Sequence, residues 1–181
     1  MSRTLNRSVW LLAVLALLVA LLMMSVVPGA ASAKKAAKAP SLVDTAIAVN
    51  SSGPYAGAFD TLIAAVLAAD PAVLQTLSSR AQYTVFAPTD GAFAKLGLTA
   101  ANIGTVPQAD LTNILLYHVA YGRRYAADVI ASDQIRMLNG GFVYQSGGVL
   151  TDAQERMSTI IVTDVMASNG IIHAIDTVLL P

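Results

Sequence analysis

The chain has 181 residues, 55% of them hydrophobic, and 11 lysines and arginines balance 11 acidic residues to a net charge of zero. A protein that binds nucleic acid needs a clustered basic face, and this composition gives no sign of one, so we expect no nucleic-acid partner. The chain has no cysteine, which excludes disulfides, thiol nucleophiles and a lipid anchor attached to cysteine.

Residues 1–33 have the three parts of a secretory signal. Arg3 and Arg7 make a positive start, an apolar run covers residues 9–27, and an Ala-Ser-Ala sequence at residues 31–33 provides small side chains for cleavage. The apolar run is also long enough to cross ~30 Å of hydrocarbon, so an uncleaved membrane anchor is the alternative. Both alternatives place the domain outside the cytoplasm, secreted, extracellular or in the cell envelope, and only the anchor brings it to a membrane.

Residues 34–40 read as a short lysine-bearing linker, and we expect one globular domain over residues 41–181. Apolar residues recur at helical spacing through the first half of that domain. Ser41 and Asp70 are suited to cap helices, and Pro71 fits a first helical turn. Helices are predicted over residues 41–47, 59–67, 70–77, a short stretch after Thr89-Asp90, and 110–119.

Short β-type runs alternate with glycines in the second half of the domain. One earlier strand, over residues 83–87, is stopped by Pro88. Strands are also predicted over 142–144, 158–163 and 170–175, whereas the polar stretch from Gly147 to Met157 is expected to be a loop. Helices followed by strands, with no internal repeat, favour a single α+β domain over a doubly wound α/β sheet.

Three segments are specific enough to compare with a known family. The first runs from Thr84 to Phe93 (TVFAPTDGAF), the second is LLYHV at residues 115–119, and the third runs from Asn169 to Asp176 (NGIIHAID) and ends the chain with VLLP. In this order they resemble the signatures of the fasciclin (FAS1) domain family. The resemblance implies a wedge-shaped β-sandwich with helices packed along one edge, and an extracellular adhesion module.

The resemblance also names a candidate surface for a cell-surface or extracellular matrix protein. It implicates the Tyr117-His118 segment in receptor contacts, with the Thr89-Asp90 turn beside it. His118 has a structural interpretation as well, in which its ring hydrogen-bonds the first signature near Thr89 and Asp90.

A catalytic role is the less favoured interpretation of these residues. Thr89, His118 and Asp90 supply the types that a nucleophile, base and orienter require. Thr-Asp before a helix is ordinary capping chemistry, however, and no G-x-S-x-G elbow is present. We therefore expect a non-catalytic module without a cofactor.

Two further residue patterns are interpreted structurally. His173 shares a strand face with Ile171 and Ile175, which is typical of a core histidine. With two histidines in the chain and no acidic cluster at ligand spacing, no metal site is expected. Asn50-Ser51-Ser52 matches a glycosylation sequon in an expected loop.

A carrier of a small apolar ligand, a lipid or a pigment, is the alternative function. Some fasciclin domains resemble proteins of that kind. The apolar excess supports it, and Met137, Met157 and Met166 are available as adaptable pocket lining. The structural alternative is that these methionines fill the core.

Overall fold

The computed structural model describes residues 39–181. The predictions of an export signal and of most of the linker concern residues 1–38 and lie outside the described residues. Ala39 and Pro40 precede the first helix without regular structure.

Some of the helices begin where the sequence supplies a side-chain cap. Ser41 Oγ accepts a hydrogen bond from Asp44 N at 3.3 Å while Ser41 N donates to Asp44 Oδ2 at 3.0 Å, which completes a capping box. Asp70 accepts from Ala72 N at 2.8 Å, with Pro71 in the first turn. These caps confirm the predicted starts. The helices are α2 (Leu42–Ser51), α3 (Asp60–Ala68), α4 (Pro71–Ser78), α5 (Asp90–Ala94), the 3₁₀ turn η1 (Ile103–Thr105), α6 (Gln108–Leu116) and α7 (Ala126–Ile130).

The helix predicted over residues 110–119 is shorter than expected at its C-terminal end. It stops at Leu116, because Val119 is paired with Val85 in the sheet. Apolar periodicity does not show this end, since Val119 is buried in either conformation.

Seven strands form one mixed sheet in the order β2-β1-β7-β6-β5-β4-β3. β1 and β7 run parallel, from Tyr83 opposite Gly170 to Pro88 opposite Ile175, and the other neighbours are antiparallel. The strands are β1 (Tyr83–Pro88), β2 (Val119–Tyr121), β3 (Gln134–Arg136), β4 (Phe142–Ser146), β5 (Val149–Thr151), β6 (Met157–Ala167) and β7 (Gly170–Ile175).

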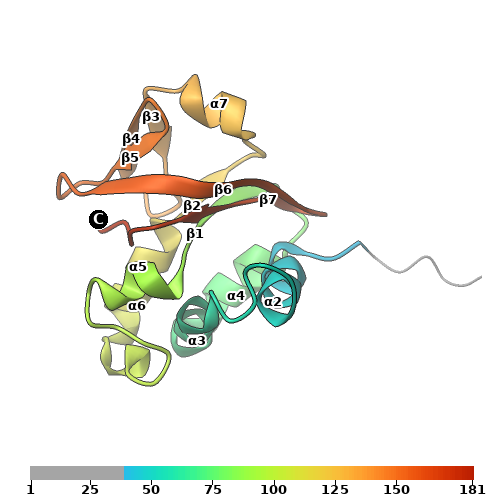
Figure 1. Ribbon diagram of the computed structural model, residues 1–181, viewed down its shortest axis with the longest axis vertical. Helices are drawn as coiled ribbons and strands as arrows, with labels where there is room; N and C mark the ends of the chain where they lie inside the picture. Colours follow the sequence, from blue (N-terminus) through green and yellow to red (C-terminus); the bar gives the residue numbers. More distant parts are fainter. Residues whose placement is uncertain (1–38) are drawn as a thin grey trace, which may run out of the picture. The chain divides into compact units, whose positions relative to one another are not determined.

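The sheet folds over until its two ends meet. Ala120 of β2 forms an antiparallel bridge with Met137, which follows β3, and Leu138 N donates to Val119 O at 2.7 Å. β3, β4 and β5 therefore stand at an angle over the other strands, while α2 to α6 lie together on the opposite side of β1 and β7 (Figure 1). The predicted α+β sandwich is confirmed.

The prediction of a loop from Gly147 to Met157 was wrong in part. Val149–Thr151 forms β5, which pairs with β4 on one side and β6 on the other. A strand of three residues is too short for alternation to reveal it, and its one fully buried side chain is Leu150. Only the turn from Asp152 to Arg156 is the polar loop that the sequence suggested.

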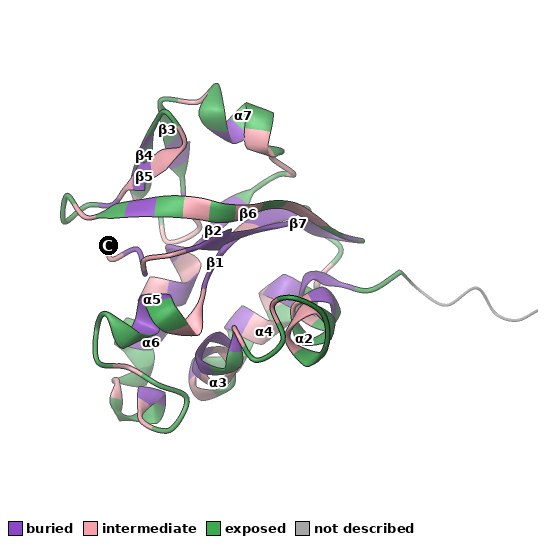
Figure 2. Cartoon of the chain, in the orientation of Figure 1, coloured by how far each residue is buried: buried purple, intermediate pink, exposed green. Residues whose placement is uncertain are grey.

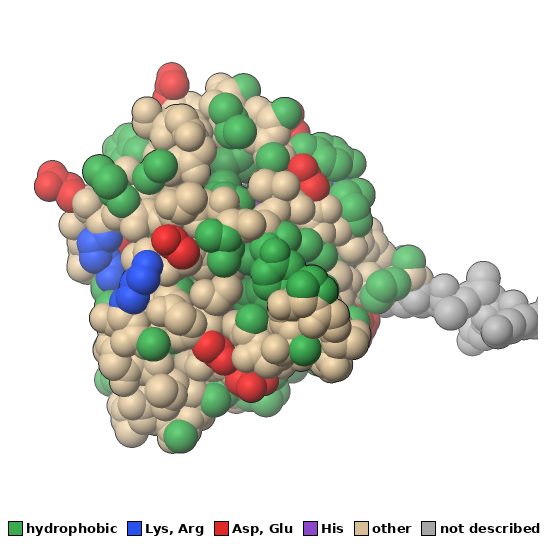
Figure 3. All heavy atoms as spheres, viewed as in Figure 1, with side chains coloured by type: hydrophobic (Ala, Val, Ile, Leu, Met, Phe, Trp, Pro, Cys, Tyr) green, Lys and Arg blue, Asp and Glu red, His purple; other side chains and the backbone are tan. Residues whose placement is uncertain are grey.

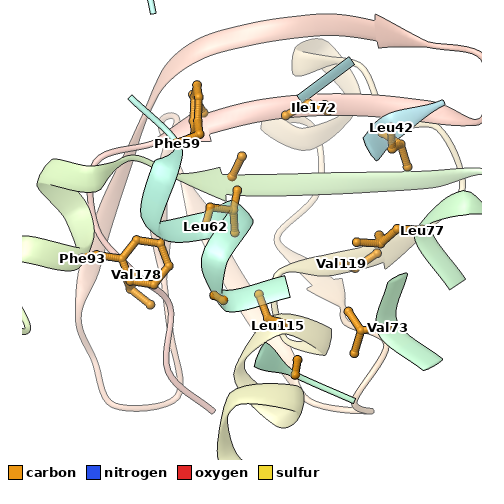
Figure 4. Close-up of a cluster of buried hydrophobic side chains, with 14 of the residues drawn as sticks. Leu42, Phe59, Leu62, Val73, Leu77, Phe93, Leu115, Val119, Ile172 and Val178 are labelled. Atoms are coloured by element: carbon orange, nitrogen blue, oxygen red, sulfur yellow. The ribbon is translucent and has the colours of Figure 1, made fainter. Parts of the chain in front are cut away.

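β7 separates two hydrophobic cores and is buried at every position (Figure 2). Side chains alternate across a strand, so Ile172 and Ala174 face the helices while His173 and Ile175 face the interior of the folded sheet. The core under the helices is shown in Figure 4, where Leu62, Leu115 and Val119 come from three different elements.

Among the described residues, no single helix has the length and apolar character to cross a membrane. α3 and α4 pass that test only as a pair, and they are bent by 116° where they meet.

Replacing Gly170 by alanine is expected to destabilise the fold strongly. A Cβ there would lie 2.2 Å from Tyr83 O and 2.9 Å from Leu42 Cδ1, and the Tyr83 carbonyl belongs to a paired strand that cannot move aside freely. We expect Gly170→Ala to lower the free energy of unfolding by at least ~2 kcal/mol in urea titrations.

Gly104→Ala is the matched control, because no heavy atom lies within 4 Å of a Cβ at that position. It should stay within ~1 kcal/mol of the parent protein or become more stable. Equal stability of the two variants would contradict the close approach of β7 to β1.

Candidate functional site

Tyr117 lies in the interior and not on a surface. It follows α6, and its side chain is fully buried. Its hydroxyl donates to Phe142 O and accepts from Ala153 N at 3.1 Å, and burial is the main cause that raises the pKa of this phenol. A Cβ on Gly141 would lie 2.8 Å from the ring. Tyr117 therefore joins α6 to β4 and to the turn after β5.

His118 is also buried, with both ring nitrogens engaged. Nδ1 lies 2.8 Å from the carbonyl oxygen of Ile114, to which it donates, and Nε2 accepts from Leu179 N at 3.0 Å. This pairing requires the neutral ring with its proton on Nδ1. Burial lowers the pKa of His118 to about 4. The ring is neutral at ordinary pH and has no free nitrogen to act as a base.

The expected hydrogen bond from the His118 ring to the region of Thr89 and Asp90 is not present. The ring turns back along α6 and reaches the C-terminal segment, while the backbone carbonyl of His118 accepts a hydrogen bond from Phe86 N of the first signature at 2.8 Å. The partner Leu179 is 61 positions away in the chain, so sequence spacing gave no signal for it.

Thr89 and Asp90 are half-buried and hold helix starts. Thr89 Oγ1 accepts from Ala92 N at 3.3 Å and caps α5. Asp90 Oδ1 accepts from Thr61 N at 2.9 Å, and Asp90 N donates to Ala58 O at 2.8 Å, which fixes the start of α3. The hydrogen bonds of Thr89, Asp90 and His118 lead to other groups, so the structure assembles no nucleophile and base from them.

His173 occupies the core position that the sequence predicted. Its Nδ1 accepts from Asp164 N at 3.2 Å and its Nε2 donates to Arg124 O at 2.9 Å, while its ring stacks on Phe86 with centroids 5.7 Å apart. Over residues 39–181, no group of three or more His, Asp or Glu side chains is arranged to hold a metal ion.

Asn50 of the glycosylation sequon lies at the end of α2 and not in a loop. Its Oδ1 accepts from Phe59 N at 2.8 Å and its Nδ2 donates to Asp60 Oδ1 at 2.7 Å. The amide that a glycan would modify therefore already joins α2 to α3.

Two adjoining cavities lie between the helices and the sheet, and we call them together the apolar channel. The outer cavity has a volume of about 180 Å³ and the inner one about 160 Å³. Both are lined by Ala46 of α2, Leu62 of α3, and Ala87 and Ile172 of the sheet. Leu62 and Ile172 are labelled in Figure 4.

The two ends of the apolar channel differ. The outer cavity is bounded by Tyr55 of the α2–α3 loop and by Val162 and Val165 of β6. Hydrophobic side chains gather on the face of the molecule where β6 and α2 come together (Figure 3). The inner cavity is bounded by Ile47 and Leu67, which are 46% and 71% exposed.

The lining of the apolar channel carries no charge. Its polar members are Ser52 and Tyr55 in the outer cavity and the neutral His118 in the inner one. Such walls exclude charged ligands and suit an apolar one. Sequence reasoning missed this site, because its lining comes from distant segments.

The three methionines proposed as pocket lining do not line the channel. Met137 is buried within the folded sheet, whereas Met157 and Met166 are 71% and 48% exposed. Met137 therefore fills the core, as the structural alternative predicted.

A model of the fasciclin domain matches residues 57–181. The chain belongs to the fasciclin family. Members of this family are generally non-catalytic.

Relatives of this fasciclin chain occur in distant organisms. It is 41% identical over 128 residues to Protein sll1483 of Synechocystis sp., covering 68% of this chain and 67% of that protein. It is 34% identical over 125 residues to the transforming growth factor-beta-induced protein ig-h3 of Sus scrofa, covering 68% of this chain and 18% of that protein.

A solved structure confirms the fold. The FAS1 domain pair from the insect cell adhesion molecule fasciclin I superposes with a TM-score of 0.61 at 17% identity, covering 80% of this chain and 52% of that structure. The present chain thus spans about half of that domain pair.

The buried neutral His118 predicts a loss of stability in acid. The unfolded chain binds a proton near the ordinary pKa of 6.5, whereas the folded protein binds it only near 4. The contribution of His118 is complete above pH 6.5 and falls as the pH drops to 4, by about 3 kcal/mol in total. Urea unfolding at a series of pH values measures it.

His118→Gln is the control, because glutamine does not titrate. The variant is expected to be less stable at neutral pH but to lose less stability between pH 6.5 and 4. Parallel stability curves for the two proteins would show that His118 is not the titrating group.

Proposed function

We propose that this chain is a non-catalytic binding module that acts outside the cytoplasm, at a cell surface or in the envelope, on a protein or matrix partner. The export pattern of residues 1–33 and the family support this proposal. A structure with the same fold comes from a cell adhesion molecule, and a relative is the growth-factor-induced protein ig-h3.

The state of the two histidines is the observation that carries the non-catalytic proposal. A general base needs a free nitrogen that can take a proton, and both nitrogens of His118 and of His173 are engaged with the backbone. The three family signatures therefore serve the fold, and binding falls to surfaces and cavities around them.

The candidate partner surface is narrower than the sequence suggested. Because Tyr117 and His118 are buried, we propose that they support the surface from beneath and do not contact the partner themselves. The accessible part is the Thr89-Asp90 turn with α5 and its C-cap residue, Lys95. Lys95 lies 3.6 Å from Asp176 and is exposed, so a partner meets a polar surface here.

A charge reversal on α5 tests this surface. We expect Lys95→Glu to reduce capture of a cell-surface or matrix partner roughly tenfold, the effect of losing ~1.4 kcal/mol of binding free energy. Quantitative pull-down from surface extracts of the host measures it. Tyr117→Phe, which keeps the buried ring, is the control and should bind as the parent does. If Lys95→Glu captures as much partner as the parent protein does, the partner does not bind at this surface.

The second candidate function is a carrier of a small apolar ligand, a lipid or a pigment. The uncharged apolar channel favours it. Each cavity is below the roughly 300–1,000 Å³ that is common for ligand pockets, so a slender chain fits better than a bulky ring system.

Filling the part of the apolar channel that the two cavities share tests the carrier function. Ala46 lines both cavities, so Ala46→Phe places a ring where the ligand would pass. With a fluorescent polyene fatty acid as the probe, we expect binding to weaken at least ~tenfold, since the ring removes the space the chain needs.

Ala48→Phe is the matched control, because Ala48 lies on the same helix and is exposed. It should bind the probe as the parent does. If both phenylalanine variants bind the probe equally, or if the parent binds none, the carrier function is refuted.

A further inference from the structure

Residues 52–57, the first part of the loop between α2 and α3, form one side of the outer cavity. They supply Ser52, Pro54 and Tyr55 to the lining, and β6 supplies the opposite side with Val162 and Val165. The loop and β6 therefore both border this cavity.

The base of this loop is firmly held by Asn50. Asn50 O accepts from Gly57 N at 2.8 Å, and its side chain joins Phe59 N and Asp60 Oδ1. Just beyond, Ala58 O accepts from Asp90 N at 2.8 Å. The two ends of the loop are thereby fixed close together, whatever its tip does.

The tip of the loop has few restraints. Its backbone bonds are two local ones, from Ala56 N to Gly53 O at 3.2 Å and from Ala58 N to Tyr55 O at 3.1 Å. Within the described structure, no side chain from Gly53 to Gly57 makes a hydrogen bond, and the Tyr55 side chain is held by packing at the cavity.

Glycines with positive φ flank Tyr55 on both sides. Gly53 has φ 92° and Gly57 has φ 71°. A Cβ on Gly53 would meet no heavy atom within 4 Å, and one on Gly57 only Asp60 Oδ2 at 4.0 Å. Crowding therefore does not explain either glycine, and both give the backbone the freedom that a hinge uses.

We propose that residues 52–57 are a gate over the outer end of the apolar channel, with hinges at Gly53 and Gly57 and the Tyr55 ring as the closing group. Its base stays clamped by Asn50 while the tip swings away from β6. As a gate for a ligand it rests on the proposed carrier function, but the opening itself is a property of the loop. Segments with few buried contacts open at a small fraction of the free energy of global unfolding.

A chain without cysteine allows the gate to be measured without any ligand. Ala174 lines the outer cavity and is 2% exposed, so Ala174→Cys places a thiol behind the gate. Its reaction with a disulfide reagent such as DTNB reports opening. Ala48→Cys on the exposed face of α2 gives the rate of an open thiol.

Ala120→Cys is the matched buried control. Ala120 is 0% exposed, also lies in a strand, and belongs to the core within the folded sheet, away from the channel. Its thiol reacts only when the domain unfolds more widely. We expect the thiol of Ala174→Cys to react more slowly than that of Ala48→Cys and faster than that of Ala120→Cys.

Removing the Tyr55 ring should then raise the reaction rate of only the thiol that lies behind the gate. Tyr55→Ala is expected to raise the rate for Ala174→Cys by about tenfold and to leave the rate for Ala120→Cys unchanged. Tyr55→Phe keeps the ring and should match the parent, since no hydrogen bond holds the hydroxyl.

Three results would overturn the gate. They are an unchanged rate for Ala174→Cys with Tyr55→Ala, equal acceleration of both buried thiols, and a parent rate for Ala174→Cys that equals the rate for Ala48→Cys. Probe binding separates the two proposals. If the thiol is gated but the protein takes up no polyene fatty acid, the carrier function alone is refuted. If the protein takes up the fatty acid at a rate that Tyr55→Ala does not change, the gate alone is refuted.

Discussion

Asn169 fastens the helical layer to the sheet, and the rest of the structure depends on that connection. Its buried amide accepts from Leu42 N at 2.8 Å and donates to Leu77 O and Ser79 O, both at 2.8 Å. Leaving such a group unpaired costs ~1–3 kcal/mol, so α2 and α4 are held in place together. Gly170 follows directly, and its missing side chain lets β7 approach Tyr83 and Leu42. α2 can then cover the sheet as the roof of the apolar channel.

The side chains of the family signatures are engaged in hydrogen bonds of this kind, within the interior. The Tyr117 hydroxyl joins β4 to the turn after β5, His118 accepts from Leu179 N, and Asp90 accepts from Thr61 N. A side chain engaged in the interior is not free to recognise a partner. Functional differences between proteins with these signatures are therefore expected in what surrounds them, namely exposed helix ends, loops and unfilled volume.

The two cores differ in how completely they are filled. The core within the folded sheet is built from large side chains, among them Phe86, Tyr117 and Leu150. The core under the helices contains several buried alanines, including Ala65, Ala87 and Ala174. Short side chains on both sides of an interface leave space that longer neighbours must fill. Here that space remains as the apolar channel, and the loop that borders it has only local backbone hydrogen bonds at its tip.

The sequence by itself determined those features that depend on neighbours a few positions apart. The caps at Ser41 and Asp70, the strand ending at Pro88 and the core position of His173 all follow from local spacing, and the three signatures identified the family. Only the tertiary structure decided the partner of His118, the burial of Tyr117, the short strand β5 and the apolar channel. Each of these depends on which distant segments meet: Leu179 returns to His118, and Ala46, Ala87 and Ile172 come together only when α2 packs across β1 and β7. Periodicity reports that a side chain is buried, but not against what.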